Sequence, residues 1–327
     1  MTDYLWDRSE PVDPEIRDLE ETLAPLRFKP GNSPAMPRSF RPGLPTYAAI
    51  AASIALAVAA WWVWPGTTGQ ATPWKIADVD GTVQIGRATA RTSAVLKTGQ
   101  EIRTGASSRA TLEADDFGRV ELQSGSELRM VESRDARQRF ELNRGRIHAL
   151  IWAPPSRFAV ETGSARAIDL GCQYDLSVDE RGDGYLSVET GWVAFQFKQR
   201  ESFIPAGAAC HTARRQGPGL PFFEDASPAF RDAVRVYDVA GSHAALEIIL
   251  TQARPRDGLT LWHLLTRVND DERAMVFERF SKLVPVLATV DRTRVSARDR
   301  EALDLCWNAL GLDSAEWWRD WKRNWRD

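Results

Sequence analysis

The feature that most constrains this chain is an apolar run over residues 47–64, which contains no charged side chain and is followed by Pro65. A helix of this length rises about 27 Å, close to the thickness of the hydrocarbon core of a bilayer. Its backbone groups are satisfied within the helix, as lipid requires. The run therefore predicts one transmembrane helix over residues 47–64, with soluble parts on opposite sides of a membrane.

Two other interpretations of this run are a cleavable signal peptide and a buried helix of a soluble domain. The apolar core of a signal peptide normally lies within about the first 30 residues, whereas 46 residues precede this run. A core helix would normally show a polar face, and residues 47–64 show none. Both comparisons favour a membrane span.

The charges that flank the run predict its orientation. Residues 22–45 carry four cations and no acid, whereas Lys75 is the only cation in the twenty residues after Pro65. Positive residues near a span tend to stay on the cytoplasmic side. We therefore expect the N-terminus in the cytoplasm and the bulk of the chain outside it.

Residues 1–28 predict a short acidic helix, in which Asp13 caps the N-terminus and Pro14 occupies the first turn. Its apolar face contains residues at helical spacing, namely Ile16, Leu19, Leu23 and Leu26, and Trp6, which precedes the helix, is added to this face as a candidate contact. So short a segment builds no core of its own, and its acidity disfavours anionic lipid. A protein partner or dimer mate would cover the face; a solvated, half-formed tail is the alternative. Residues 29–46, rich in proline, predict a linker.

Residues 74–214 alternate apolar and polar side chains with a period of two, as in Ala110, Leu112 and Ala114. This period is typical of half-buried strands. Glycine-containing turn signals separate the strands at residues 115–118, 124–125, 143–145, 181–184 and 189–191. The pattern predicts an all-β domain, either a sandwich or a solenoid.

Residues 225–327 change to helical periodicity and predict a small all-α domain. Ser227 and Pro228 are placed as an N-cap and first helical residue, and apolar stripes follow at Leu259/Trp262/Leu265, Val276/Phe280/Leu283 and Leu303/Trp307/Leu310. A last helix, with tryptophans at 317, 321 and 325, is expected to pack in the core; an exposed docking surface is the alternative.

Several segments of the β region resemble the FecR-type transmembrane regulators of bacterial cell-surface signalling. They are LKTGQEIRTGASSRATL, GRVELQSGSEL, FELNRGRIHALI, IDLGCQYDLSVDE and VETGWVAF, in that order along the chain. The resemblance covers about 120 residues. It implies an all-β periplasmic domain, a single span in the inner membrane and a cytoplasmic segment that holds or assists a sigma factor.

On this resemblance, the apolar face of residues 1–28 is the expected contact for a sigma factor, and the periplasmic part receives a protein or ligand. The alternative is a membrane-anchored periplasmic binding or scaffold module without a sigma-factor role. An envelope enzyme is a third hypothesis, but the sequence contains no nucleophile elbow, zincin, P-loop or dinucleotide-binding motif. We expect no enzyme activity, no cofactor and no metal, and the net charge of −3 without a basic patch predicts no direct nucleic-acid contact.

Three cysteines follow the predicted span, at positions 172, 210 and 306. An exported domain can hold a disulfide, so a bond between Cys172 and Cys210 is one hypothesis, and three buried small apolar side chains are the other. The adjacent pair Cys210 and His211 is a poor metal site, because neighbours on a strand point to opposite faces. His263, beside an apolar stripe, is expected to be a packing histidine.

Overall fold

The computed structural model describes residues 73–134, 137–285 and 290–313. The predicted helical segment (1–28), linker (29–46) and span (47–64) lie outside the described residues, as do the tryptophans after position 313. Every described residue belongs to the compact unit Thr68–Asp327. Among the described helices, none combines the length and the apolar character that a membrane crossing requires.

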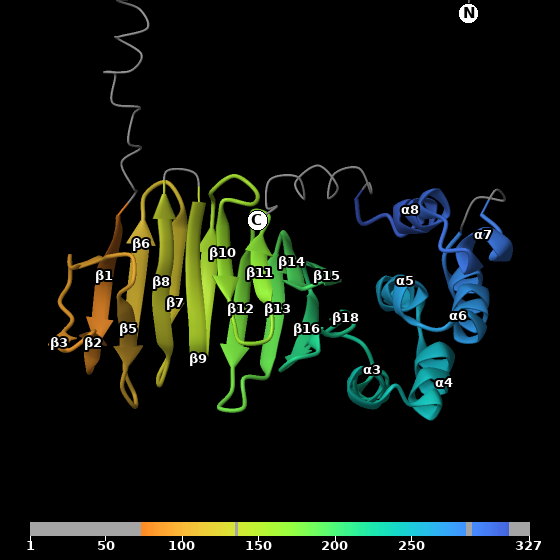
Figure 1. The fold of residues 1–327 in the computed structure, drawn as a ribbon, viewed down its shortest axis with the longest axis horizontal. Coiled ribbons are helices and arrows are strands. Elements are labelled where there is room, and N and C mark those ends of the chain that lie inside the picture. The colour runs from red at the N-terminus through yellow and green to blue at the C-terminus, as the bar shows by residue number, and fades with distance from the viewer. Residues whose placement is uncertain (1–72, 135–136, 286–289, 314–327) are drawn as a thin grey trace, which may run out of the picture. The chain divides into compact units, whose positions relative to one another are not determined.

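Eighteen strands in the described residues form two sheets that share one strand (Figure 1). Sheet A contains β1 (Trp74–Asp80), β4 (Val95–Leu96), β6 (Arg109–Ala114), β7 (Gly118–Leu122), β12 (Gln173–Val178), β13 (Gly184–Thr190), β16 (Ala208–Ala213), β17 (Gly217–Pro218) and β18 (Phe222–Phe223). Sheet B contains β2 (Val83–Ile85), β3 (Ala88–Thr89), β5 (Glu101–Thr104), β8 (Glu127–Arg134), β10 (Phe158–Glu161), β11 (Arg166–Asp169), β14 (Trp192–Phe197) and β15 (Arg200–Pro205).

The shared strand is β9 (Arg137–Ile151), which passes from sheet B into sheet A. Its first half pairs with β8 and, in parallel, with β10, and its second half pairs antiparallel with β7 and β12. The passage falls at Gly145, whose φ of 91° is readily adopted only by glycine; a Cβ there would lie 2.4 Å from the Ser126 backbone. The turn predicted at residues 143–145 is therefore wrong, because glycine here redirects a continuous strand.

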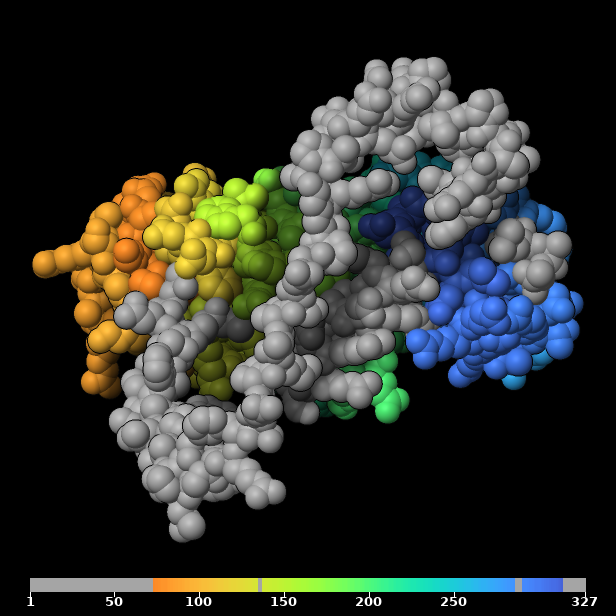
Figure 2. Space-filling model, turned by 90° about the horizontal axis from the view of Figure 1, so that it is seen from above, coloured from red at the N-terminus to blue at the C-terminus, as the bar shows by residue number. Residues whose placement is uncertain are grey.

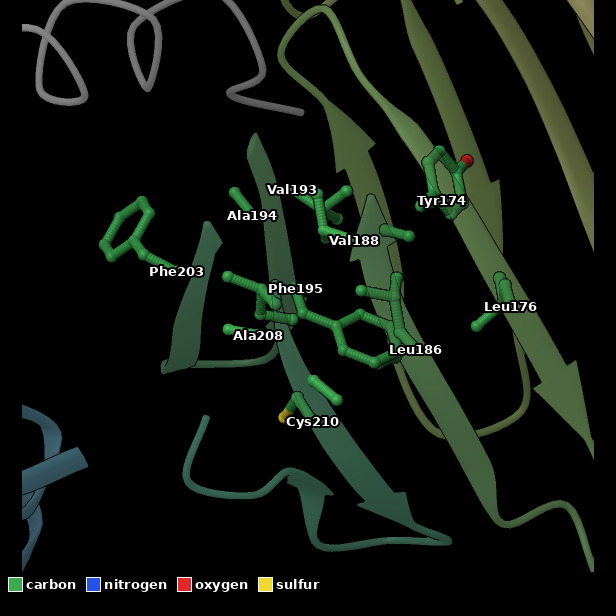
Figure 3. Packing of buried hydrophobic residues seen from close by; sticks show 14 of the residues in the cluster. Tyr174, Leu176, Leu186, Val188, Val193, Ala194, Phe195, Phe203, Ala208 and Cys210 are labelled. Atoms are coloured by element: carbon green, nitrogen blue, oxygen red, sulfur yellow. The ribbon is translucent and has the colours of Figure 1, made fainter. Parts of the chain in front are cut away.

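The core lies between the two sheets and follows the predicted alternation. In β6, Ala110, Leu112 and Ala114 are buried while the residues between them are not. Figure 3 shows Leu186 and Val188 of β13 packed against Val193 and Phe195 of β14. Side chains from both sheets thus exclude water from one apolar layer, as in a β-sandwich.

An aromatic cluster closes the N-terminal part of this core. The rings of Trp74, Phe140 and Phe158 are all fully buried, with centroids 5.1–5.7 Å apart. The Trp74 indole N–H donates a hydrogen bond of 3.2 Å to the buried amide oxygen of Gln138. The one polar atom of the largest core side chain therefore has a partner, as burial requires.

The helical region follows the last strand, so the predicted order of a β domain and a small all-α region is confirmed. It comprises α3 (Pro228–Ala240), α4 (His243–Gln252), the 3-10 helix η2 (Pro255–Asp257), α5 (Gly258–Arg267), α6 (Asp270–Leu283), α7 (Arg292–Ser296) and α8 (Arg300–Ala309). The Ser227 hydroxyl accepts a hydrogen bond from the Phe230 N–H at the start of α3, and Pro228 is the first helical residue. The space-filling view shows the same order along the chain, from the orange to green residues of the β domain to the blue residues of the helical region (Figure 2).

Helix α5 attaches the helical region to β15 of sheet B. The neutral imidazole of His263 accepts a hydrogen bond of 3.1 Å from the Phe203 N–H at Nε2, and its Nδ1–H donates to the Leu259 carbonyl. Arg267 donates to the Glu201 carbonyl and the Ser202 hydroxyl, each at 2.7 Å. These contacts satisfy backbone groups on the outer edge of β15 and protect that edge from pairing with another chain.

Candidate functional site

A groove opens where helix α3 approaches the outer face of sheet A. It has a volume of about 380 Å³ and is walled by β13, β16 and β17 on one side and by α3 on the other. Polar side chains from β13, β16 and α3 converge on it, among them Tyr185, His211, Arg235 and Asp238. A concave site with several converging polar groups is the usual form of a ligand site.

Close approach of α3 to the sheet depends on a glycine. A Cβ at Gly219 would lie 2.1 Å from the Asp238 Oδ2, so a larger residue would force the helix or the carboxylate to move. Both Asp238 oxygens instead accept hydrogen bonds from the Leu220 N–H, at 2.9 and 3.0 Å. The Asp238 carboxylate of α3 therefore binds the backbone at Leu220, directly after Gly219.

The walls of the groove differ in their electrostatics. Burial raises the pKa of Asp238 to about 6, against the opposing effects of the Leu220 N–H and Arg267. Burial also lowers the pKa of His211, and the nearby charge of Arg235 lowers it further. At neutral pH the sheet side therefore presents an uncharged imidazole, while α3 presents a guanidinium and a partly shielded carboxylate.

Aromatic rings continue from the groove into a neighbouring hollow. The His211 ring stacks on Phe222 with centroids 5.7 Å apart and lies 4.8 Å from Tyr185. The Tyr185 hydroxyl donates a hydrogen bond of 2.9 Å to Glu224. This arrangement offers ring faces for packing and Arg235 for pairing with an anionic group, which are the contacts of a binding site.

A separate cluster on the outer face of sheet A could hold a metal ion. His148 of β9, Asp175 of β12 and Glu189 of β13 each offer one ligand atom, and these atoms lie within 4.8 Å of one another. This side-chain set was not predicted from the sequence, because its members are 14 to 41 residues apart in the chain. Only the pairing of β9, β12 and β13 brings them together.

The structure does not contain the disulfide considered for Cys172 and Cys210, since both are buried free thiols. Cys172 lies beside Gly191 at one end of β13, whereas Cys210 pairs with Leu186 across the other edge of that strand. Five residues of extended strand separate these positions by roughly 16 Å, while a disulfide needs Cα atoms about 4.4–6.8 Å apart. The alternative of buried small apolar side chains is the one the structure has.

Burial also changes the chemistry of these thiols. The Cys172 thiol donates a hydrogen bond to the buried carboxyl of Asp169, and burial followed by the charge of Asp169 raises the pKa of Cys172 well above its usual range. Burial raises the pKa of Cys210 to about 12. Both side chains are therefore protonated and unreactive at neutral pH.

The remaining sequence-predicted site residues divide into two groups. The face formed by Trp6, Ile16, Leu19, Leu23 and Leu26 lies outside the described residues. His263 is fully buried against β15, as predicted for a packing histidine, and burial lowers its pKa to about 3. The groove residues Tyr185 and Asp238 carried no signal in the sequence beyond lying on a strand and a helix.

The structure is a two-sheet β domain with an attached helical region and a groove where the two meet. Residues 100–194, from β5 into β14, match the family model described as FecR protein. Residues 100–194 are therefore a FecR domain, and the family resemblance inferred from the sequence segments of this region is confirmed.

Two crystal structures of a candidate anti-sigma factor from Parabacteroides distasonis ATCC 8503 are also similar to the chain. The first has 19% sequence identity and a TM-score of 0.34, and the similarity covers 38% of this chain and 60% of that one. The second has 17% identity and a TM-score of 0.34, with 46% and 73% of the two chains covered. The chain thus spans about 60% of the length of the first structure. The comparison with curated proteins gives no match.

Proposed function

We propose that the chain is a single-pass regulator of the bacterial inner membrane, which passes an extracytoplasmic signal to a sigma factor in the cytoplasm. The observation that carries the proposal is the order of its segments. An acidic amphipathic segment (1–28) and an apolar run (47–64) precede the FecR domain at residues 100–194. The cations before the apolar run favour a cytoplasmic N-terminus and a periplasmic FecR domain.

The groove is the proposed site at which the signal is received. A ligand or partner protein there would contact Tyr185 and His211 on the sheet and Arg235 and Asp238 on α3. Its affinity would depend on where α3 lies against the sheet. This is the physical requirement for a signal, because a ligand shifts an equilibrium only if it binds the two states unequally.

The apolar face of residues 1–28 is the proposed output. Ile16, Leu19, Leu23 and Leu26 recur at helical spacing on a segment too short to bury them internally. An amphipathic helix of this kind can bind by inserting its apolar residues into a groove of a partner. The proposed partner is a sigma factor, and no reaction or cofactor is part of the proposal.

Transcript profiling tests this function. A strain that lacks the protein and a strain that expresses it without residues 1–28 should change transcription of the same compact set of promoters. A matched control with Arg38 and Arg41 replaced by lysine keeps the charge of the linker and should leave that set unchanged. The regulator proposal fails if neither the strain without the protein nor the strain without residues 1–28 changes transcription. If the strain without the protein then shows an impaired envelope, a membrane-anchored scaffold is favoured.

A further inference from the structure

We propose that the outer face of sheet A carries a binding site for a divalent transition-metal ion, with Zn²⁺ the best-fitting ion, formed by His148, Asp175 and Glu189. Three adjacent strands supply one ligand each, and the three ligand atoms lie within 4.8 Å of one another. One imidazole nitrogen and two carboxylate oxygens are a ligand set that zinc accepts. The site is distinct from the groove beside α3 and goes beyond the proposed regulatory function.

The distances fit a single ion. His148 Nδ1 lies 3.5 Å from Asp175 Oδ2 and 4.0 Å from Glu189 Oε1. Ligand atoms at zinc–nitrogen and zinc–oxygen distances of about 2.0–2.2 Å in tetrahedral geometry are separated by roughly 3.4 Å. The two distances from His148 are within about 0.6 Å of this separation, and the carboxylate oxygens of Asp175 and Glu189 are at most 4.8 Å apart. Closing the site around an ion therefore requires the carboxylates to approach each other by at most about 1.4 Å.

The position of the three residues on paired strands preorganises this geometry. Asp175 lies directly opposite His148 in the register of β12 and β9, so both side chains leave the same face of the sheet. Glu121 of β7 lies opposite His148 on the other side and adds a further carboxylate to that face. A sheet fixes such side chains more firmly than a loop would.

The carboxylates at this site are not neutralised by basic side chains. Among the described residues, neither Asp175 nor Glu189 forms a salt bridge with lysine or arginine, and each has His148 as its only ion-pair partner. The neighbouring acid Glu121 strengthens the attraction for a cation. A divalent ion would neutralise the carboxylates of Asp175 and Glu189.

Gln173 lies beside the second ring nitrogen of His148, where a metal-bound histidine needs a hydrogen-bond partner. Its amide group lies 3.2 Å from His148 Nε2 and 2.6 Å from Glu189. When Nδ1 binds the ion, the single proton of the neutral imidazole resides on Nε2. A turn of the Gln173 amide would then let its oxygen accept from Nε2–H, in place of the hydrogen bond that its nitrogen donates to Glu189. Such partners orient the imidazole and raise metal affinity.

His243 also has two acidic side chains nearby, but their positions around the ring differ from those at His148. His243 lies 3.7 Å from Glu247 through Nε2 and 3.7 Å from Glu272 through Nδ1. The two acids therefore approach opposite nitrogens of that ring, and no single ion can contact all three residues. At His148 both acids approach the same nitrogen.

Titration of the full-length protein in detergent with Zn²⁺ alone, followed by calorimetry, tests the proposal. The wild-type protein should bind one equivalent, and His148→Ala, Asp175→Asn and Glu189→Gln should each weaken binding by at least about tenfold, as loss of a ligand implies. His243→Ala is the matched control and should bind as the wild type does.

Co²⁺ supplies an independent readout. The wild-type protein should give a visible absorption band of a Co²⁺ site with nitrogen and oxygen ligands, and Asp175→Asn should reduce it while the far-ultraviolet circular dichroism stays unchanged. The proposal is overturned if the wild-type protein binds no Zn²⁺, or if His148→Ala binds it as tightly as the wild type while His243→Ala does not.

Discussion

The buried carboxyl of Asp169 should make the stability of this protein depend on pH in a way that one substitution removes. Asp169 ends β11, is 1% exposed, and accepts hydrogen bonds from the Gly171 N–H and the Cys172 thiol. Burial raises its pKa from 3.8 to about 7, against the lowering effect of these donors. The folded protein therefore keeps a proton that the unfolded chain releases.

The sign and size of the effect follow from this difference. Because the folded state binds the extra proton between pH 3.8 and about 7, the contribution of Asp169 to stability is largest in acid and falls as the pH rises towards 7. Each pH unit in that interval lowers the free energy of unfolding by about 1.4 kcal/mol. Between pH 5 and pH 8, Asp169 should therefore lower the free energy of unfolding by about 3 kcal/mol.

Asp169→Asn replaces the carboxyl by a neutral amide of similar shape. Between pH 5 and pH 8, the free energy of unfolding of the wild type should fall by about 3 kcal/mol more than that of the variant. The other titrating groups are common to both proteins and cancel in this comparison. Urea denaturation of residues 68–327, followed by tryptophan fluorescence at both pH values, measures this difference. Asp115→Asn, on an exposed turn, should follow the wild-type curve. Parallel curves for wild type and Asp169→Asn would refute the reasoning.

Three further predictions concern packing and topology. Gly219→Ala should lower the free energy of unfolding by about 1–3 kcal/mol, because its Cβ would displace the Asp238 carboxylate; denaturation should show Gly163→Ala, where the space is open, within about 0.5 kcal/mol of wild type. His263→Leu should cost about 1–3 kcal/mol, because it leaves the buried Phe203 N–H unpaired, and a Tm equal to that of wild type would contradict this. Protease added to intact spheroplasts should digest residues 73 onwards and spare an N-terminal tag; loss of the tag alone would invert the predicted orientation.

Local patterns in the sequence predicted much of the fold. The period of two in residues 74–214 is the period at which a strand buries alternate side chains, and β6 shows it directly. Ser227 and Pro228 predicted the start of α3, because capping involves only neighbouring residues. The prediction that His263 packs in the interior also followed from its place beside an apolar stripe.

The errors and omissions share a physical cause, which is that they depend on contacts between distant segments. A glycine at position 145 predicts a turn locally, but β9 pairs with β8 up to Arg144 and with β12 from Gly145 onwards, which keeps the strand continuous there. The groove joins Tyr185, His211 and Asp238 from two strands and a helix, and the cluster at His148 depends on strand register. The positions of Cys172 and Cys210 likewise follow from the strand that separates them.

Co-purification from native membranes tests the central claim most directly. The full-length protein, solubilised in mild detergent and captured through a tag at its C-terminus, should retain a sigma factor, and alanine at Ile16, Leu19, Leu23 and Leu26 should abolish that retention while the protein stays in the membrane fraction. Equal recovery of a sigma factor with the substituted protein, or recovery of none with the wild type, would contradict the account.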